Sequence, residues 1–118
     1  MALIVRNLRW LGVSVEDPPA AAAFFRDALG LRMLFDEANT VELETEEGDR
    51  VQLFGPGSRY YERGRRPFPL FEVDDASVAR EELSARGVEV GPLEADNEWT
   101  WFDVVGPEGL LCELGSRL

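Results

Sequence analysis

Tryptophans and a carboxylate alternate in one short stretch of the sequence. In residues 98–105, EWTWFDVV, Trp99, Trp101 and Asp103 occupy every second position. Alternate residues of a β-strand face the same side, so a strand here would place both indoles and the carboxylate on one surface. Indoles stack on planar rings and attract cations, and a carboxylate can neutralise a bound ammonium or guanidinium group. The pattern predicts a binding surface for a small aromatic molecule, with a preference for a cation.

The residue types that are missing narrow the chemistry. The sequence has no histidine and no lysine, so all twelve basic residues are arginines. This composition excludes a histidine general base, a Ser-His or Cys-His nucleophile pair, a Schiff-base lysine and every histidine-containing metal site. The net charge of −11 argues against a nucleic-acid partner and favours a cationic or neutral ligand. Solubility alone would account for the charge equally well.

The length and the single cysteine indicate a compact intracellular protein. A chain of 118 residues fits one domain that can bury a core. The first apolar run ends at Arg6, too early for a signal peptide or a membrane span, which favours a cytoplasmic protein with no membrane partner. Cys112 is the only cysteine, which excludes an internal disulfide and suits a reducing compartment.

The first half of the chain predicts a strand, a helix and three further strands. Residues 8–15 alternate between apolar and other residues, as a strand does. Asp17 is expected to cap a helix that begins at Pro18 and stops at Gly30. The three strands that follow are predicted at 31–35, 40–45 and 50–54, with turns at 36–39 and 46–49.

The second half repeats this order after an irregular connector over 55–67. A strand is predicted at 68–73, a helix capped by Asp75 that ends at Gly87, and strands at 88–90, 98–105 and 110–114. Asp17 and Asp75 are 58 positions apart, and Gly30 and Gly87 are 57 apart. A half of this size could hardly bury a sheet face alone. We therefore predict one domain, 1–118, made of repeat one (about 8–54), the connector 55–67 and repeat two (about 68–114).

The strand alternation also predicts which side chains face a ligand. A helix should cover the more apolar face of each sheet, such as the face with Val13 and Val15. The opposite faces combine large aromatic residues with carboxylates, which suits a concave and partly wet cleft. The predicted ligand-binding residues are Trp10, Gln52, Phe54, Phe68, Glu72, Trp99, Trp101, Asp103 and Glu113.

Several of these residues have a plain structural alternative. Trp10 and Phe68 could simply pack against each other, and Glu113 could form a salt bridge with Arg50 or another arginine. Cys112 is expected to be an inert thiol on the helix side. The connector is predicted to be a solvated loop, with Tyr60 and Tyr61 as a lid or as packed residues. Its arginines are expected to be solvated or to pair with the acidic surface, in preference to forming an anion site; they are Arg59, Arg63, Arg65 and Arg66.

Three motifs carry a resemblance to a known family. They are VEDPPAAAAFFRDALGLRM near the start, FEVDDASVAREELSARGVEV in the middle and DVVGPEGLLCEL near the end. Together they resemble the vicinal oxygen chelate superfamily, over nearly the whole stretch from Leu8 to Leu114. That group includes glyoxalase I, fosfomycin-resistance, extradiol dioxygenase and bleomycin-binding proteins. The resemblance implies an α+β fold of two tandem βαβββ modules, which form curved mixed sheets around a cleft with helices on the outer face.

The resemblance also implies where a metal would bind, and this chain departs from it there. Metal-using members take ligands from the first and last strand of each repeat, and here those positions hold Trp10, Gln52, Phe68 and Glu113. Aromatic rings of this kind coordinate nothing, and two oxygen ligands alone hold a transition metal weakly. We therefore expect no metal and no cofactor, and none of the glyoxalase, fosfomycin-transferase or dioxygenase activities.

What remains is similar to the bleomycin-binding branch, whose members sequester a cationic aromatic antibiotic between two subunits without chemistry. The resemblance implies a homodimeric binding protein with a resistance or carrier role and no catalytic residue. One alternative is a metal-independent enzyme of lyase or isomerase type, with Asp103 and Glu113 as acid and base. Another is a subunit whose aromatic face is a protein interface.

Overall fold

The structure is a computed structural model that describes residues 3–37 and 39–118 of the chain. The chain divides into two compact units. The first unit is Arg9–Phe68, and the second unit combines the N-terminal residues up to Leu8 with Pro69–Leu118. Across 3–37 and 39–118, no helix has the length and apolar character that crossing a bilayer requires.

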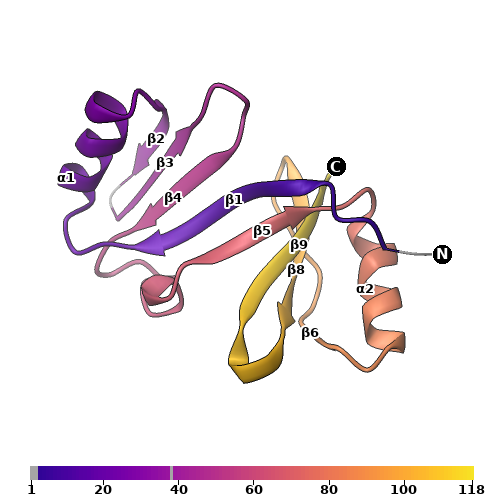
Figure 1. Ribbon diagram of the computed structural model, residues 1–118. Coiled ribbons are helices and arrows are strands. Elements are labelled where there is room, and N and C mark those ends of the chain that lie inside the picture. The colour runs from indigo at the N-terminus through magenta and orange to yellow at the C-terminus, as the bar shows by residue number, and fades with distance from the viewer. Residues whose placement is uncertain (1–2, 38) are drawn as a thin grey trace. The chain divides into compact units, whose positions relative to one another are not determined.

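The first unit is a four-stranded mixed sheet with a helix against it (Figure 1). Its elements are β1 (Asn7–Ser14), α1 (Pro18–Ala23), β2 (Arg32–Glu37), β3 (Thr40–Glu44) and β4 (Arg50–Phe54). The strand order is β2-β3-β4-β1. β4 runs parallel to β1, while β2, β3 and β4 pair antiparallel. These elements form one βαβββ module.

The helix of the first unit begins as predicted but changes type before it ends. The Asp17 side chain accepts a hydrogen bond from the Ala20 N–H at 3.1 Å, and Pro18 opens the helix. From Phe24 to Ala28 the chain is a π-helix (η1), in which the Leu29 N–H donates to the carbonyl five residues earlier, on Phe24. The prediction of one regular helix up to Gly30 was therefore wrong in its second half. The wider turn leaves Phe24 exposed while Phe25 packs on the core.

The second unit repeats this topology. Its elements are β5 (Phe68–Glu72), α2 (Ala76–Ala85), β6 (Glu89–Val90), β7 (Glu94–Ala95), β8 (Trp99–Val105) and β9 (Leu111–Arg117). β9 runs parallel to β5 and antiparallel to β8, as β4 does to β1 and β3. β6 and β7 both pair with β8. The α+β class and the paired βαβββ modules are therefore confirmed; the short strand β7 was not predicted.

The same local signals bound both helices. The Asp75 side chain accepts from the Val78 N–H at 3.2 Å, as Asp17 does in the first unit. After the helices, Gly30 and Gly87 adopt φ angles of 76° and 81°. Only glycine enters this left-handed region without steric cost, so each glycine ends its helix at the matching place in its repeat.

Each unit has its own apolar core on the side that faces its helix. In the first unit Val41, Leu43 and Leu53 are buried with Ala22 of α1, and Val13 and Val51 pack on them. In the second unit the buried residues are Val73, Ala76, Ala79, Phe102, Val104 and Leu114. The predicted helix-side faces are thus confirmed for these strands. Cys112 packs on the second core, and burial, followed by the charges of Glu113 and Asp103, raises the pKa of its thiol.

One turn prediction differs from the structure. The turn expected at 36–39 is shorter, because Asp36 and Glu37 remain in β2 and pair with Val41 and Thr40 of β3. Residue 38, in the middle of the predicted turn, lies outside the described residues. The turn expected at 46–49 is present, with the Gly48 N–H donating to the Thr45 carbonyl at 3.1 Å.

Candidate functional site

In the first unit, Trp10 folds back over its own strand. Its ring lies across Gly12, where a Cβ atom would overlap the indole carbon Cη2. From there the indole Nε1–H donates a hydrogen bond to Gln52 Oε1 on β4 at 3.0 Å. Gly12 and Gln52 are neighbours in the parallel register of β1 and β4, so the absence of a side chain at Gly12 lets the indole reach the amide.

Trp10 belongs to an aromatic cluster, which we define as Trp10, Phe54, Tyr60 and Phe68. The rings of Trp10 and Phe68 meet edge-on at 5.2 Å, and those of Phe54 and Phe68 stack at 6.2 Å between centroids. Tyr60 lies 5.4 Å from Phe54. Phe54 and Phe68 are each 2% exposed. The structural alternative for Trp10 and Phe68 is therefore confirmed: the two rings pack together.

The connector is packed on this cluster at several points. The Ser14 hydroxyl donates to the Tyr61 carbonyl, and a Cβ atom at the buried Gly64 would overlap Ser14. The Arg63 guanidinium lies over the Phe68 ring, 4.8 Å from its centroid. The prediction of a solvated loop was wrong for this part, because an aromatic face attracts a cation and shields it from water. Arg59, Arg65 and Arg66 are exposed, as predicted.

Two charged residues on this face, Glu42 and Glu44, were not predicted from the sequence. Glu42 is 7% exposed and lies directly opposite Gln52 in the register of β3 and β4. Arg50 is 3.5 Å from both Glu42 and Glu44, and Arg32 pairs with Glu44. The alternation of Thr40, Glu42 and Glu44 could have revealed these two residues, since it places both glutamates on the face that carries Arg50 and Gln52.

In the second unit, carboxylates and an indole share one sheet face. Asp103 and Glu113 are direct cross-strand partners on β8 and β9, and Trp101 faces Gly115. Glu72 on β5 also lies beside Gly115, so it joins the same face. We call Glu72, Trp101, Asp103 and Glu113 the acidic face. The predicted grouping of these residues is confirmed by the strand register; their role in binding stays a prediction.

The predicted site residues of this unit differ in exposure and in the contacts they make. Glu113 is only 8% exposed. Asn7 Nδ2 donates to Glu72 Oε1 at 3.0 Å, which orients that carboxylate. Trp99 is 9% exposed, and the Arg117 guanidinium covers its ring at 4.7 Å. One face of the Trp99 indole is already occupied, so Trp101 is the better placed of the two to stack on a ligand.

The nine predicted site residues are thus divided between the units. Trp10, Gln52, Phe54 and Phe68 lie in the first unit, and Glu72, Trp99, Trp101, Asp103 and Glu113 lie in the second. The residues at the family's metal positions do not fit a metal. Trp10 and Phe68 offer no donor atom, and Gln52 Oε1 accepts from the indole. Within residues 3–37 and 39–118, no group of three or more Asp, Glu or Cys is arranged to hold an ion.

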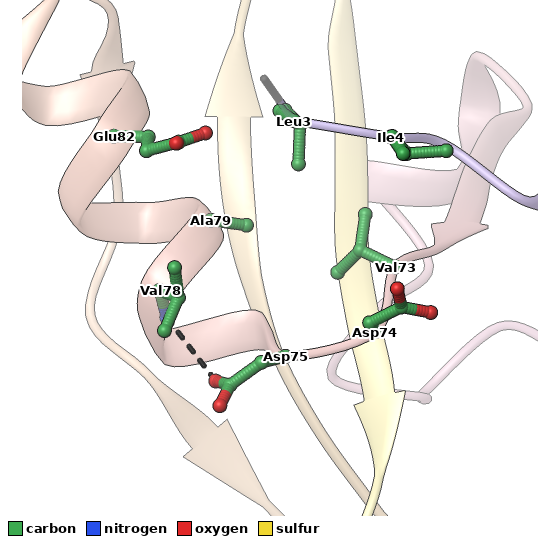
Figure 2. A pocket seen from close by; sticks show the side chains of 8 residues that line it. All are labelled: Leu3, Ile4, Val73, Asp74, Asp75, Val78, Ala79 and Glu82. Carbon is green, nitrogen blue, oxygen red and sulfur yellow. Dashed lines mark hydrogen bonds between the residues drawn. The ribbon is translucent and has the colours of Figure 1, made fainter. Parts of the chain in front are cut away.

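A hollow of about 330 Å³ lies elsewhere in the second unit, between the N-terminal residues Leu3 and Ile4 and the start of α2 (Figure 2). Its floor is apolar, with Val73, Val78 and Ala79. Its carboxylates already have structural roles, because Asp75 caps α2 and Asp74 forms a two-point ion pair with Arg6. The hydrogen bonds from Arg6 lower the pKa of Asp74. The hollow contains none of the predicted site residues.

Comparisons with known proteins give the family and the fold. Residues 7–114 match the model of the Glyoxalase/Bleomycin resistance protein/Dioxygenase superfamily. No curated protein matches the sequence. Methylmalonyl-CoA epimerase from Mycobacterium tuberculosis is a similar solved structure, with a TM-score of 0.77 and 20% identity, covering 97% of this chain and 89% of that one.

Two larger proteins also have similar structures. The Mn(II)-bound glyoxalase from Novosphingobium aromaticivorans has a TM-score of 0.76 and 23% identity over 98% of this chain and 40% of that one. An extradiol ring-cleaving dioxygenase from B. fuscum has a TM-score of 0.76 and 16% identity, over 98% of this chain and 34% of that one. At these identities the likeness shows the fold alone.

Proposed function

This chain belongs to the Glyoxalase/Bleomycin resistance protein/Dioxygenase superfamily, and we propose that it binds a small aromatic cation on its acidic face without a metal. The family name covers both resistance proteins and enzymes, so membership alone leaves the function open. The residues of the acidic face supply the preference for a cation and an aromatic ring. A resistance or carrier role is the corresponding biological function.

The observation that supports this proposal is the pairing of Asp103 with Glu113 beside Trp101. Two carboxylates beside an indole offer charge-assisted hydrogen bonds to a bound ammonium or guanidinium group. The indole adds stacking and cation–π attraction, roughly 0.5–2 kcal/mol per contact. The net charge of −11 attracts cations from solution and repels anions.

Exchanging the carboxylates for amides tests the role of charge. Asp103→Asn and Glu113→Gln are each expected to weaken N-methylisoquinolinium by about 1–3 kcal/mol, the usual range for a charge-assisted bond. Neither change should alter the binding of neutral isoquinolin-1-one. Tryptophan fluorescence reports both titrations, and the cation's affinity should fall as salt is raised.

Two further variants complete this test. Trp101→Ala should weaken both probes, because stacking area is lost whatever the charge. Glu81→Gln, on the exposed side of α2, removes one charge away from the face and should leave the ratio of the two affinities unchanged. If the Asp103 and Glu113 variants also leave that ratio unchanged, the carboxylates are structural and the proposal is wrong.

The same pair of carboxylates favours a second candidate, a metal-independent enzyme of isomerase or lyase type. One carboxylate could remove a proton from a carbon next to a carbonyl, and its neighbour could return a proton. Similar structures bear the names of enzymes, among them methylmalonyl-CoA epimerases. In heavy water this candidate requires deuterium to enter methylmalonyl-CoA at that carbon, with the rate lost in Asp103→Asn. If deuterium enters no faster than in buffer without protein, this enzyme candidate is wrong and the binding function remains.

We also expect the protein to be a homodimer. Trp10 and Trp101 are partly exposed, which is a liability on a monomer, and a second copy of the chain could cover them. Sedimentation equilibrium should therefore give about twice the chain mass of 13.2 kDa. A mass of one chain at micromolar concentration would show that this expectation is wrong.

A further inference from the structure

The orientation of the Gln52 amide is determined by its partner. The indole N–H of Trp10 can only donate, so the atom 3.0 Å from it must be the amide oxygen. The amide nitrogen, with its two hydrogens, is then on the other side of the side chain. A metal at this position would need the oxygen, which the indole already uses.

The surroundings hold this arrangement in place. Trp10 is confined between Gly12, where no Cβ atom could fit, and the rings of Phe54 and Phe68. The indole therefore has little freedom to turn away from Gln52. Gln52 itself is half-buried, so part of the residue remains open to solvent.

The neighbouring charges are balanced. Glu42 lies opposite Gln52 on β3, and Arg50 is 3.5 Å from it. Arg50 also reaches Glu44, which pairs with Arg32. Two arginines and two glutamates alternate along this face with no net charge. The ion pairs beside Gln52 thus add no net charge of their own.

We propose that Gln52 is a specificity-determining hydrogen-bond donor, oriented by Trp10 as a positioning residue. The first unit would then recognise a hydrogen-bond acceptor, such as a carbonyl or N-oxide oxygen, on a neutral planar group. This inference does not depend on the cation site proposed for the acidic face, whose residues lie in the second unit.

The chain offers an unambiguous signal for this contact, because Gln52 is its only glutamine. Protein labelled with ¹⁵N at the glutamine side chain has a single amide NH₂ pair in its NMR spectrum. Titration with isoquinoline N-oxide, a neutral planar acceptor, should shift that pair saturably. N-methylisoquinolinium, which has a similar ring but no acceptor, should not shift it.

Two variants separate the donor from its positioning residue. Gln52→Glu still accepts from the indole but has no N–H, and it should weaken the N-oxide about three- to tenfold, the range for one lost hydrogen bond. Trp10→Phe keeps a ring but lacks the N–H, so the NH₂ pair should move towards the shifts of a free amide and the N-oxide should bind more weakly. Phe24→Leu, a change on the exposed side of η1, should leave both readouts unchanged.

Each outcome decides the proposal. A saturable shift that is lost in Gln52→Glu, with a changed amide pair in Trp10→Phe, supports both assignments. If the N-oxide leaves the Gln52 signals where they are, or both probes move them equally, Gln52 is not a selective donor. If the amide pair is the same in Trp10→Phe as in the native protein, Trp10 does not position it. Loss of N-methylisoquinolinium binding alone concerns only the acidic face.

Discussion

Dialysis against manganese, nickel or zinc is expected to leave the protein with no stoichiometric transition metal. Trp10 and Phe68 occupy two of the positions that carry metal ligands in relatives, and neither ring has a donor atom for a metal. The oxygen of Gln52 is engaged by the Trp10 indole. One of the two lone pairs of that oxygen is already used, and a metal would gain only a single weak oxygen ligand in this unit. Elemental analysis after dialysis measures the result directly.

A double substitution provides the positive control for this expectation. The Trp10 and Phe68 rings are 5.2 Å apart in the same unit, close enough for two imidazoles to share one ion. Trp10→His with Phe68→His would also release the Gln52 oxygen, giving three donors, as in zinc sites with an open position. This variant should gain zinc binding, whereas Trp10→Phe with Phe68→Leu should not. About one metal per native chain, coordinated by Gln52 and Glu113, would contradict the expectation.

Phe102→Ala is expected to be among the most destabilising single changes, by about 3–5 kcal/mol in the free energy of unfolding. Phe102 is fully buried, and it is the largest side chain in the core of the second unit. It packs there with residues of α2 and of β9, such as Ala79 and Leu114, so its removal leaves a cavity between the helix and the sheet. Urea unfolding followed by circular dichroism measures the change.

Two comparisons show whether this cost arises from the cavity. Leu43 is a fully buried residue in the core of the first unit, and Leu43→Ala should cost about 2–5 kcal/mol. Phe24 is 55% exposed, and Phe24→Ala should stay within about 0.5 kcal/mol of the native stability. An equal loss for Phe24→Ala and Phe102→Ala would mean that burial in these cores does not determine stability.

Much of the fold was predictable because its signals are local. Asp17 and Asp75 act through side chains that reach an N–H three residues later, and Gly30 and Gly87 act through their own backbone angles. The strand faces follow from alternation, which depends only on neighbouring residues. These features recur at almost equal spacing, so the repeat itself was visible in the sequence.

The features that were missed depend on contacts between distant residues. Nothing in the sequence around Phe24 distinguishes a π-turn from an α-turn, and in the structure the π-helix coincides with Phe25 packing on the core. Arg63 was expected to be solvated, because its place over the Phe68 ring results from how the connector folds back. The two-residue strand β7 is too short for a periodic signal to appear.

The candidate site was predictable as a set of faces but not as a set of contacts. Alternation correctly grouped Trp101 and Asp103 with Glu113. It could not show that Trp10 turns back over Gly12 to reach Gln52, because that depends on a rotamer. It also could not show that Arg117 covers Trp99, a contact between strands. The sequence predicts which face of the sheet a side chain occupies, but not which residue it contacts there.

The residues up to Leu8 belong to the second unit, and this has a consequence for the order of folding during synthesis. The first unit is continuous from Arg9 to Phe68, so all of its strands can pair once that stretch has left the ribosome. The residues before it belong to the second unit, where Arg6 pairs with Asp74, 68 positions later. These residues can form that contact only after the second repeat has left the ribosome. Residues 3–8 are therefore made before Arg9–Phe68, but they reach their partners only after Asp74 and the rest of the second repeat have been made.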